Sequence, residues 1–213
     1  VYTPPLLVQL LIDQSMPLGK PQMNLKIFDP ACGSGIFLVS AFQRKVEWWK
    51  LENYKKTGKF QNPGRDVLKK ILRESIFGVD VKKEAVQIAI FSLSIALCDY
   101  LEPTKIWTEL RFDDLSEKNI LAQNFFNYLK ENPGKDFDLI IGNPPFKNFD
   151  KEEERDEEAL KIHKKELEVR QPTAPQKQIA FLFLKYSMQI LKPNGLLCLV
   201  MPSAPLLYND TLE

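Results

Sequence analysis

Two short segments of the 213-residue chain each combine an apolar strand pattern with a turn whose residues could do chemistry. The first turn is DPACGSG, which begins at Asp29, and the second is NPPF, which begins at Asn143. In a parallel α/β sheet, ligands bind outside the carboxyl ends of the strands, so both turns are expected to line one pocket. The residue types predict a nucleoside cofactor at the first turn and a flat amine at the second.

The glycine turn differs from a dinucleotide-binding turn. Gly33 and Gly35 allow a sharp backbone turn close to a ligand, and the helix that follows offers free amide groups. However, Leu38 occupies the position of the third glycine in that fingerprint, and the next strand-ending acid, Asp80, lies 47 residues beyond Gly33 rather than about 20. Both departures disfavour a pyrophosphate ligand.

Acidic residues at the predicted strand ends favour a nucleoside that carries positive charge. Asp29 would repel phosphate but could hold an ammonium group or a hydroxyl, and Asp80 could accept from both ribose hydroxyls. Asp113, or its neighbour Asp114, is expected to end the third strand and to accept from an adenine amine. This set suits S-adenosylmethionine. The structural alternatives are a tight strand-helix turn at the glycines, a helix N-cap at Asp80 and a surface or capping role at Asp113.

The NPPF turn offers a way to activate an aromatic amine, whose lone pair is delocalised into its ring. The side-chain oxygen of Asn143 and the carbonyl oxygen of Pro144 could accept its two N–H groups and direct the lone pair toward an electrophilic methyl group. Pro144 and Pro145 restrict the backbone, and Phe146 offers a face for stacking on a base. The alternative is an ordinary Asn-Pro turn after a strand.

These turns need a sheet that brings them together, and the apolar pattern predicts one. Alternation of strands and helices implies an α/β fold with a mostly parallel twisted sheet and helices on both faces. The expected strands are residues 26–28, 75–79, 105–112, 138–141 and 196–201. The expected helices are residues 6–12, 36–49 with an extension toward Asn62, 85–97 and 179–191, the last ended by a turn at residues 192–195.

Composition indicates one globular domain, with 44% hydrophobic and 27% charged residues. The formal charge of +1 is too low for an independent nucleic-acid-binding domain, so phosphate contacts would come from a local patch or from protein outside this chain. Cys32, Cys98 and Cys198 are far apart and His163 is the one histidine, so neither a disulfide nor a metal site is expected. Without a membrane-spanning run or a signal peptide, we expect a cytoplasmic location.

Residues 147–178 form a segment of mixed charge that follows the NPPF turn directly. Its composition is typical of a solvated helix with a mobile loop, and the alternative is a loop that orders over substrate.

Taken in order, the motifs resemble those of the class I S-adenosylmethionine-dependent methyltransferases, specifically the adenine-N6 DNA methyltransferases of bacterial restriction-modification systems. The matching motifs are TPP at 3–5, DPACGSG at 29–35, the acid Asp80, DDL at 113–115 and NPPF at 143–146. The resemblance implies a Rossmann-like fold and these roles: Thr3 and Pro5 near the methionine moiety; Asp29, Ala31, Gly33 and Gly35 around it; Asp80 on the ribose; Asp113 on the adenine; Asn143, Pro144, Pro145 and Phe146 on the target base.

The resemblance also implies the reaction, namely methyl transfer to adenine N6 in double-stranded DNA after the base is flipped out. Residues 1–213 would be the catalytic domain, with the last strands, the target-recognition domain and a nuclease or specificity subunit outside this chain. Residues 196–201 would then be an apolar sheet edge covered by other residues or by another copy. The alternatives are another planar amine or amide as substrate (protein glutamine, RNA guanine or cytosine N4), or a non-catalytic scaffold with the same fold.

Overall fold

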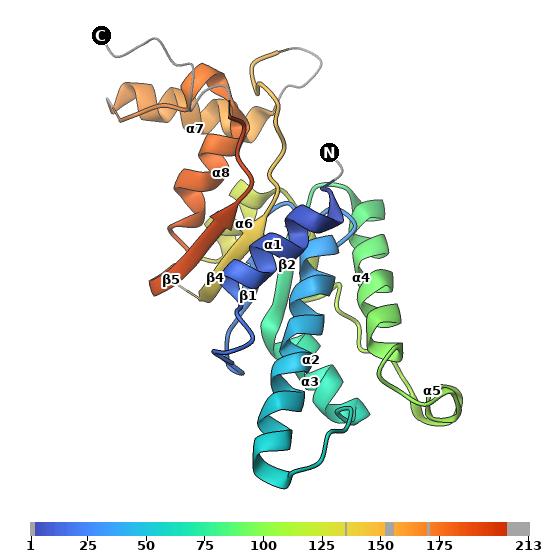
Figure 1. Ribbon diagram of the computed structural model, residues 1–213. Coiled ribbons are helices and arrows are strands. Elements are labelled where there is room, and N and C mark those ends of the chain that lie inside the picture. Colours follow the sequence, from blue (N-terminus) through green and yellow to red (C-terminus); the bar gives the residue numbers. More distant parts are fainter. Residues whose placement is uncertain (1–2, 135, 152–155, 170, 204–213) are drawn as a thin grey trace.

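A computed structural model describes residues 3–134, 136–151, 156–169 and 171–203 (Figure 1). All neighbouring strands of its five-stranded sheet pair in parallel, in the order β3-β2-β1-β4-β5, which confirms the predicted α/β class. The strands are β1 (Ile27–Asp29), β2 (Ile76–Asp80), β3 (Ile120–Ala122), β4 (Phe137–Gly142) and β5 (Leu191–Leu199). The helices are α1 (Pro5–Ser15), α2 (Ile36–Thr57), α3 (Arg65–Ser75), α4 (Lys83–Cys98), α5 (Pro103–Glu109), α6 (Phe125–Glu131), α7 (Glu157–Glu168) and α8 (Ile179–Ser187), with a short 3-10 turn at Pro175–Lys177.

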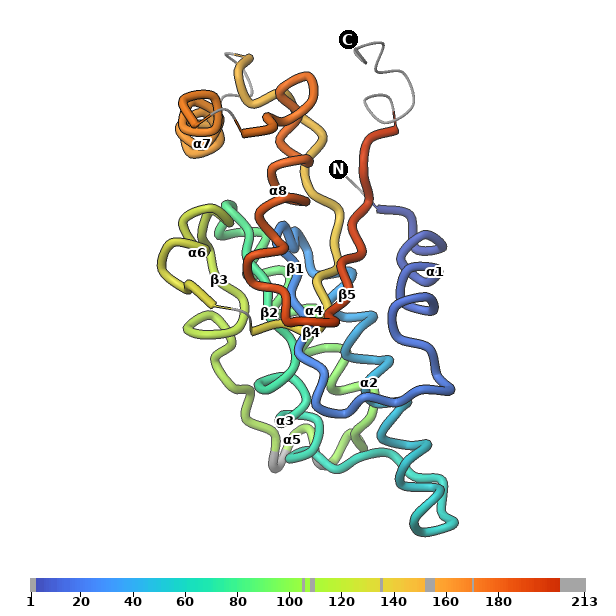
Figure 2. The backbone as a smooth tube through the Cα atoms, turned by 90° about the vertical axis from the view of Figure 1, so that its left-hand side faces the viewer, coloured from blue at the N-terminus to red at the C-terminus, as the bar shows by residue number. Residues whose placement is uncertain are grey.

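The sheet separates two hydrophobic cores because successive strand residues point to opposite faces. Ile27 and Leu139 belong to the core shared with α1, α2, α3 and α4. Phe28 and Phe137 belong to the core shared with α6, α7 and α8, where their ring centroids lie 4.6 Å apart. Figure 2 shows the strands between α1 and α2 on one side and α6 and α8 on the other. Helices therefore cover both faces, as predicted.

The predicted third strand was wrong. Residues 103–109 form α5, since Pro103 suits the first turn of a helix, and the third strand is the triplet Ile120–Ala122. The buried side chain of Asn119 fixes the start of this strand by donating to the carbonyl oxygens of Leu72, Arg73 and Ile76. Three residues are too few to show the alternation of apolar and polar residues that marks a strand. The longer apolar pattern before them was therefore mistaken for the third strand. Helices α3 and α6 were not predicted at all.

The prediction of a separate turn at residues 192–195 was also wrong, because these residues lie within a strand. Helix α8 ends at Ser187, and β5 begins at Leu191. The register pairs Phe137 with Leu191 but Leu139 with Leu196, so the intervening residues of β5 form an irregularity within the strand rather than a separate turn. Strand β5 is an edge of this sheet in the described part of the chain.

The charged segment that follows the NPPF turn contains helix α7. Asn148 and Gln178 form an antiparallel bridge at the base of this segment, and Glu166 of α7 accepts a hydrogen bond from Lys185 of α8. In Figures 1 and 2, α7 projects beyond the carboxyl ends of the strands. Residues 152–155 and 170 of the segment lie outside the described residues, and its movement over a substrate stays a prediction.

None of the helices described here is long and apolar enough to cross a membrane.

Candidate active site

Three polar side chains predicted to share a site do meet at one edge of the sheet. Asp29 ends β1, Asp80 ends β2, and Asn143 follows β4. Because β1 lies between β2 and β4 and all three strands run in the same direction, these residues project from neighbouring strand ends. The sheet order therefore brings the two motifs together.

Asp29 is the deepest of the three, with only 1% of its surface exposed. Its Oδ1 atom accepts a hydrogen bond of 3.0 Å from the Ala31 backbone N–H. A Cβ atom on Gly142 would lie 2.4 Å from the same oxygen, so the carboxyl group lies directly against the end of β4. Burial, with a smaller contribution from the nearby charge of Asp80, raises the pKa of Asp29 to about 8, although the hydrogen bond from the Ala31 N–H acts in the opposite direction. Asp29 is thus mostly protonated at neutral pH, and a cation placed beside it would favour its ionised form.

Asp80 holds the glycine turn in place. Its Oδ2 atom accepts from the Gly33 backbone N–H at 3.0 Å, and its Oδ1 atom accepts from the Lys82 backbone N–H at 2.9 Å. The N-cap of α4 is Lys82, so the alternative interpretation of Asp80 as an N-cap was wrong. The carboxylate links the end of β2 to the loop that follows β1, and each oxygen keeps a lone pair for a further donor.

The two glycines of the turn serve different purposes. Both have positive φ, 52° at Gly33 and 85° at Gly35. A Cβ on Gly35 would lie 2.9 Å from the Cβ of Ala89, so this glycine lets the start of α2 pack closely on α4. A Cβ on Gly33 would meet nothing within 4 Å. The backbone at Gly33 is therefore open to a ligand, whereas Gly35 is required by helix packing.

The amide of Asn143 is held at one end and unpartnered at the other. Its Nδ2 atom donates to Thr3 Oγ1 at 2.9 Å, across 140 positions of sequence. Its Oδ1 atom is buried and has no hydrogen-bond partner in the described part of the chain. Buried polar atoms are normally paired, so an unpaired acceptor in this position indicates a site for an external N–H donor.

The other residues of the NPPF turn differ in their exposure. Pro144 is buried, Pro145 is half-buried, and Phe146 is 38% exposed beyond the strand end. Pro5 is exposed at the first position of α1, and Ala31 is half-buried beside Asp29. The turn thus has a rigid backbone and an accessible aromatic ring.

Asp113 does not lie where the third strand ends, which corrects its expected position. It forms ion pairs with two residues of α3, at 2.7 Å to Lys69 and 3.6 Å to Arg73. Asp114 accepts from the backbone and side chain of Ser116. The third strand was predicted too early in the chain, and both aspartates in fact precede β3.

The polar residues that do follow β3 were not predicted from the sequence. The backbone N–H of Gln123 donates to the Asp80 carbonyl oxygen at 2.9 Å, and the side chain of Asn124 caps α6 by accepting from Phe126 N–H. An asparagine directly before a pair of aromatic residues is a helix-start signal that could have located this edge.

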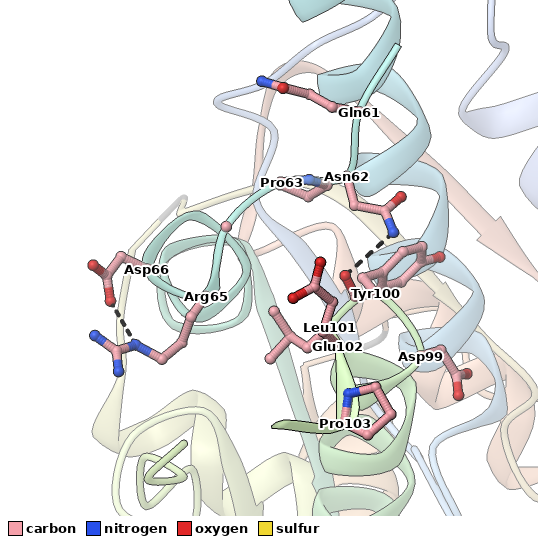
Figure 3. Close-up of a pocket in the computed structure, with 11 residues that line it drawn as sticks. Gln61, Asn62, Pro63, Arg65, Asp66, Asp99, Tyr100, Leu101, Glu102 and Pro103 are labelled. Carbon is pink, nitrogen blue, oxygen red and sulfur yellow. Dashed lines mark hydrogen bonds and ion pairs between the residues drawn. The ribbon is translucent and has the colours of Figure 1, made fainter. Parts of the chain in front are cut away.

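A separate cavity of about 740 Å³ lies at the other end of α2 and α4, away from the strand carboxyl ends (Figure 3). It is lined by residues 61–66, between α2 and the start of α3, and by residues 99–103, between α4 and the start of α5. A hydrogen bond of 3.2 Å from Asn62 Nδ2 to the Tyr100 carbonyl oxygen joins these two segments. None of the strand-end residues lines it. Within the described ranges, no cluster of His, Cys, Asp and Glu could hold a metal ion.

Comparison with known protein families places the chain in one of them. The model of the Eco57I restriction-modification methylase family matches residues 74–213, more than half of the chain. The chain belongs to this family. The match confirms the resemblance to restriction-modification methyltransferases, and the part of the chain that the Eco57I family model covers contains Asp80 and the whole NPPF turn.

Individual relatives of this Eco57I family member are much longer than the chain. The type II restriction enzyme and methyltransferase RM.Eco57I of Escherichia coli is 27% identical over 206 residues, covering 85% of this chain and 20% of that protein. The adenine-specific methyltransferase PglX of Streptomyces coelicolor is 33% identical over 101 residues, covering 45% of this chain and 8% of that protein. The chain therefore spans a fifth or less of each.

A solved structure shares the fold. The DrdV–DNA complex determined by cryoEM matches with a TM-score of 0.63 and 17% identity, covering 93% of this chain and 20% of that chain. At this identity the likeness shows a common fold.

Proposed function

We propose that this chain transfers a methyl group from S-adenosylmethionine to the N6 amine of adenine in DNA, as the modification part of a restriction-modification system. The observation that carries the proposal is the buried, unpartnered Oδ1 atom of Asn143, at the end of β4 and beside two prolines. Membership of the Eco57I restriction-modification methylase family supports it.

The strand-end residues fit this cofactor. The buried carboxyl of Asp29 suits a cationic group, because a cation would offset the burial that raises its pKa. Asp80 has lone pairs for ribose hydroxyls, and the open backbone at Gly33 leaves room for close approach. Asn124, rather than Asp113, follows β3 and is the candidate for the adenine end. When bound, S-adenosylmethionine supplies an electrophilic methyl group on a sulfonium centre.

The NPPF turn prepares the acceptor amine. Asn143 Oδ1 and the Pro144 carbonyl oxygen each accept one N–H of the amine, which turns its lone pair toward the methyl carbon. With S-adenosylmethionine bound, its sulfonium centre would supply the methyl group and leave as a neutral thioether, and the amine would give up one proton to solvent. Phe146, which is 38% exposed, stacks on the base. Because an amine inside a duplex cannot reach this turn, the base is flipped out of the stack.

The partner is double-stranded DNA. The fold shared with the DrdV–DNA complex supports this choice, as does the similarity to a protein named as an adenine-specific methyltransferase. With a formal charge of only +1, the chain needs further phosphate contacts from a specificity domain or subunit, and the cognate nuclease is a second candidate partner.

The test is methyl transfer by Asn143→Ala in the full-length protein that contains this chain. We expect transfer of a labelled methyl group into DNA to fall by about a hundredfold or more, because one of two preorganised acceptors is lost. The affinity for S-adenosylhomocysteine should be unchanged. Asn24→Ala, at an exposed position away from the strand carboxyl ends, serves as the control. Normal turnover in Asn143→Ala would refute the proposed role.

A further inference from the structure

The hydrogen bond between Thr3 and Asn143 places a residue from the start of the chain against the proposed catalytic turn. The two atoms, Thr3 Oγ1 and Asn143 Nδ2, are 2.9 Å apart, and Thr3 is only 6% exposed. We propose that the Thr3 hydroxyl is a positioning group for the Asn143 amide. It holds the nitrogen end, so that the oxygen end stays turned to the target amine.

This hydrogen bond matters because an amide has a donor end and an acceptor end. If the Asn143 amide rotated, its N–H groups would face the N–H groups of the incoming amine, and no acceptor would orient the lone pair. Terminal side-chain torsions of asparagine are broad, so the orientation depends on the partners of the amide. In the described part of the chain, Thr3 is the partner that contacts the nitrogen end while the oxygen end has none.

The backbone around Thr3 is suited to such a role. Pro4 and Pro5 follow it directly, and a residue before proline is restricted to extended backbone. The two prolines lead into α1, where Val8 and Ile12 are 2% and 1% exposed. The hydroxyl is therefore carried on a stiff dipeptide and a well-packed helix.

Buried residues of α2 fix α1 and its connection to the sheet. Arg44, which is 4% exposed, pairs with Asp13 of α1 and donates to the Met16 carbonyl oxygen just beyond it. The indole N–H of Trp48 donates to the Pro17 carbonyl oxygen at 3.1 Å. These contacts hold α1 against α2, so the position of Thr3 relative to β4 is set by the packed core.

This inference rests on the proposed function, but its chemistry differs from the role that the family resemblance gives to Thr3. A threonine beside the methionine moiety would act on cofactor affinity. A threonine that orients Asn143 would act on the rate of transfer and leave cofactor affinity unchanged. The two roles therefore predict different kinetic changes for one substitution.

The experiment compares Thr3→Val, which keeps the shape but removes the hydroxyl, with Thr3→Ser, which keeps the hydroxyl. In the full-length protein, we expect Thr3→Val to lower kcat by about tenfold, the usual effect of one buried hydrogen bond, with the affinity for S-adenosylhomocysteine unchanged. Thr3→Ser should restore kcat to within about twofold of the parent. Thr57→Val, at an exposed hydroxyl at the end of α2, is the matched control.

A second readout keeps this test separate from the proposed function. The side-chain amide resonance of Asn143, assigned by its absence in Asn143→Ala, should show slow hydrogen exchange in the parent and in Thr3→Ser and fast exchange in Thr3→Val. This pattern would support the positioning role even if methyl transfer to adenine were not found. Equal losses in Thr3→Ser and Thr3→Val, unchanged amide exchange in Thr3→Val, or weaker cofactor binding with normal kcat would overturn it.

Discussion

We predict that the buried carboxyl of Asp29 makes cofactor binding dependent on pH. With a pKa of about 8, Asp29 is mostly protonated in the free protein at pH 7. A cationic ligand group beside it favours the ionised form, so binding must expel the proton. Affinity for S-adenosylmethionine should therefore rise as the pH approaches 8 and level off above it.

The size of the effect follows from the fraction of Asp29 that is already ionised. For a pKa of about 8, the association constant should increase about tenfold from pH 6 to pH 7 and about fivefold from pH 7 to pH 8. Each binding event at pH 7 should release about 0.9 proton. The free energy of unfolding of the unliganded protein should fall as the pH rises from about 4 to about 8. In this range folded Asp29 keeps a proton that the unfolded chain, with its ordinary pKa of 3.8, has already lost.

Isothermal titration calorimetry in buffers of different ionisation enthalpy measures both the affinity and the proton release. Asp29→Asn should bind more weakly at pH 8 and lose the pH dependence, while Asp99→Asn, an exposed acid at the far end of α4, should behave as the parent. An affinity that does not change between pH 6 and pH 8, or the same slope in Asp29→Asn, would refute the reasoning.

Two glycine substitutions test the packing of the same site. Gly142→Ala would place a Cβ 2.4 Å from the Asp29 Oδ1 atom, so we expect calorimetry to show at least tenfold weaker cofactor binding by a folded protein. Gly19→Ala, whose Cβ would meet nothing within 4 Å, is the control. An affinity like that of the parent in Gly142→Ala would contradict this placement of the carboxyl group. Gly35→Ala would place a Cβ 2.9 Å from the Ala89 Cβ, at a residue whose φ is 85°. Thermal unfolding should therefore show that the free energy of unfolding falls by about 2–4 kcal/mol. An unchanged melting temperature would argue against close packing of α2 on α4 at this position.

The sequence predicted most of what positions the site, because the relevant signals are local. Apolar strands that run directly into DPACGSG and NPPF located β1 and β4, and the acid at Asp80 located the end of β2. Parallel pairing then requires these ends to meet at one edge, and the structure confirms that Asp29, Asp80 and Asn143 do so.

Features that depend on contacts between distant residues could not be predicted in this way. Strand β3 has three residues and is fixed by the Asn119 side chain, so its own pattern is weak and Asp113 was assigned to the wrong edge. The hydrogen bond between Thr3 and Asn143 joins residues 140 positions apart. The raised pKa of Asp29 depends on burial that only the packed sheet provides.

The most direct measurement of the central claim is the identity of the methylated nucleoside. The full-length protein would be incubated with DNA and S-adenosylmethionine carrying a deuterated methyl group, and the DNA would be digested and analysed by mass spectrometry. Our account predicts labelled N6-methyl-2′-deoxyadenosine in the parent reaction and none above background with Asn143→Ala. Label on cytosine, on protein or on no product, in a protein that binds the cofactor, would contradict it.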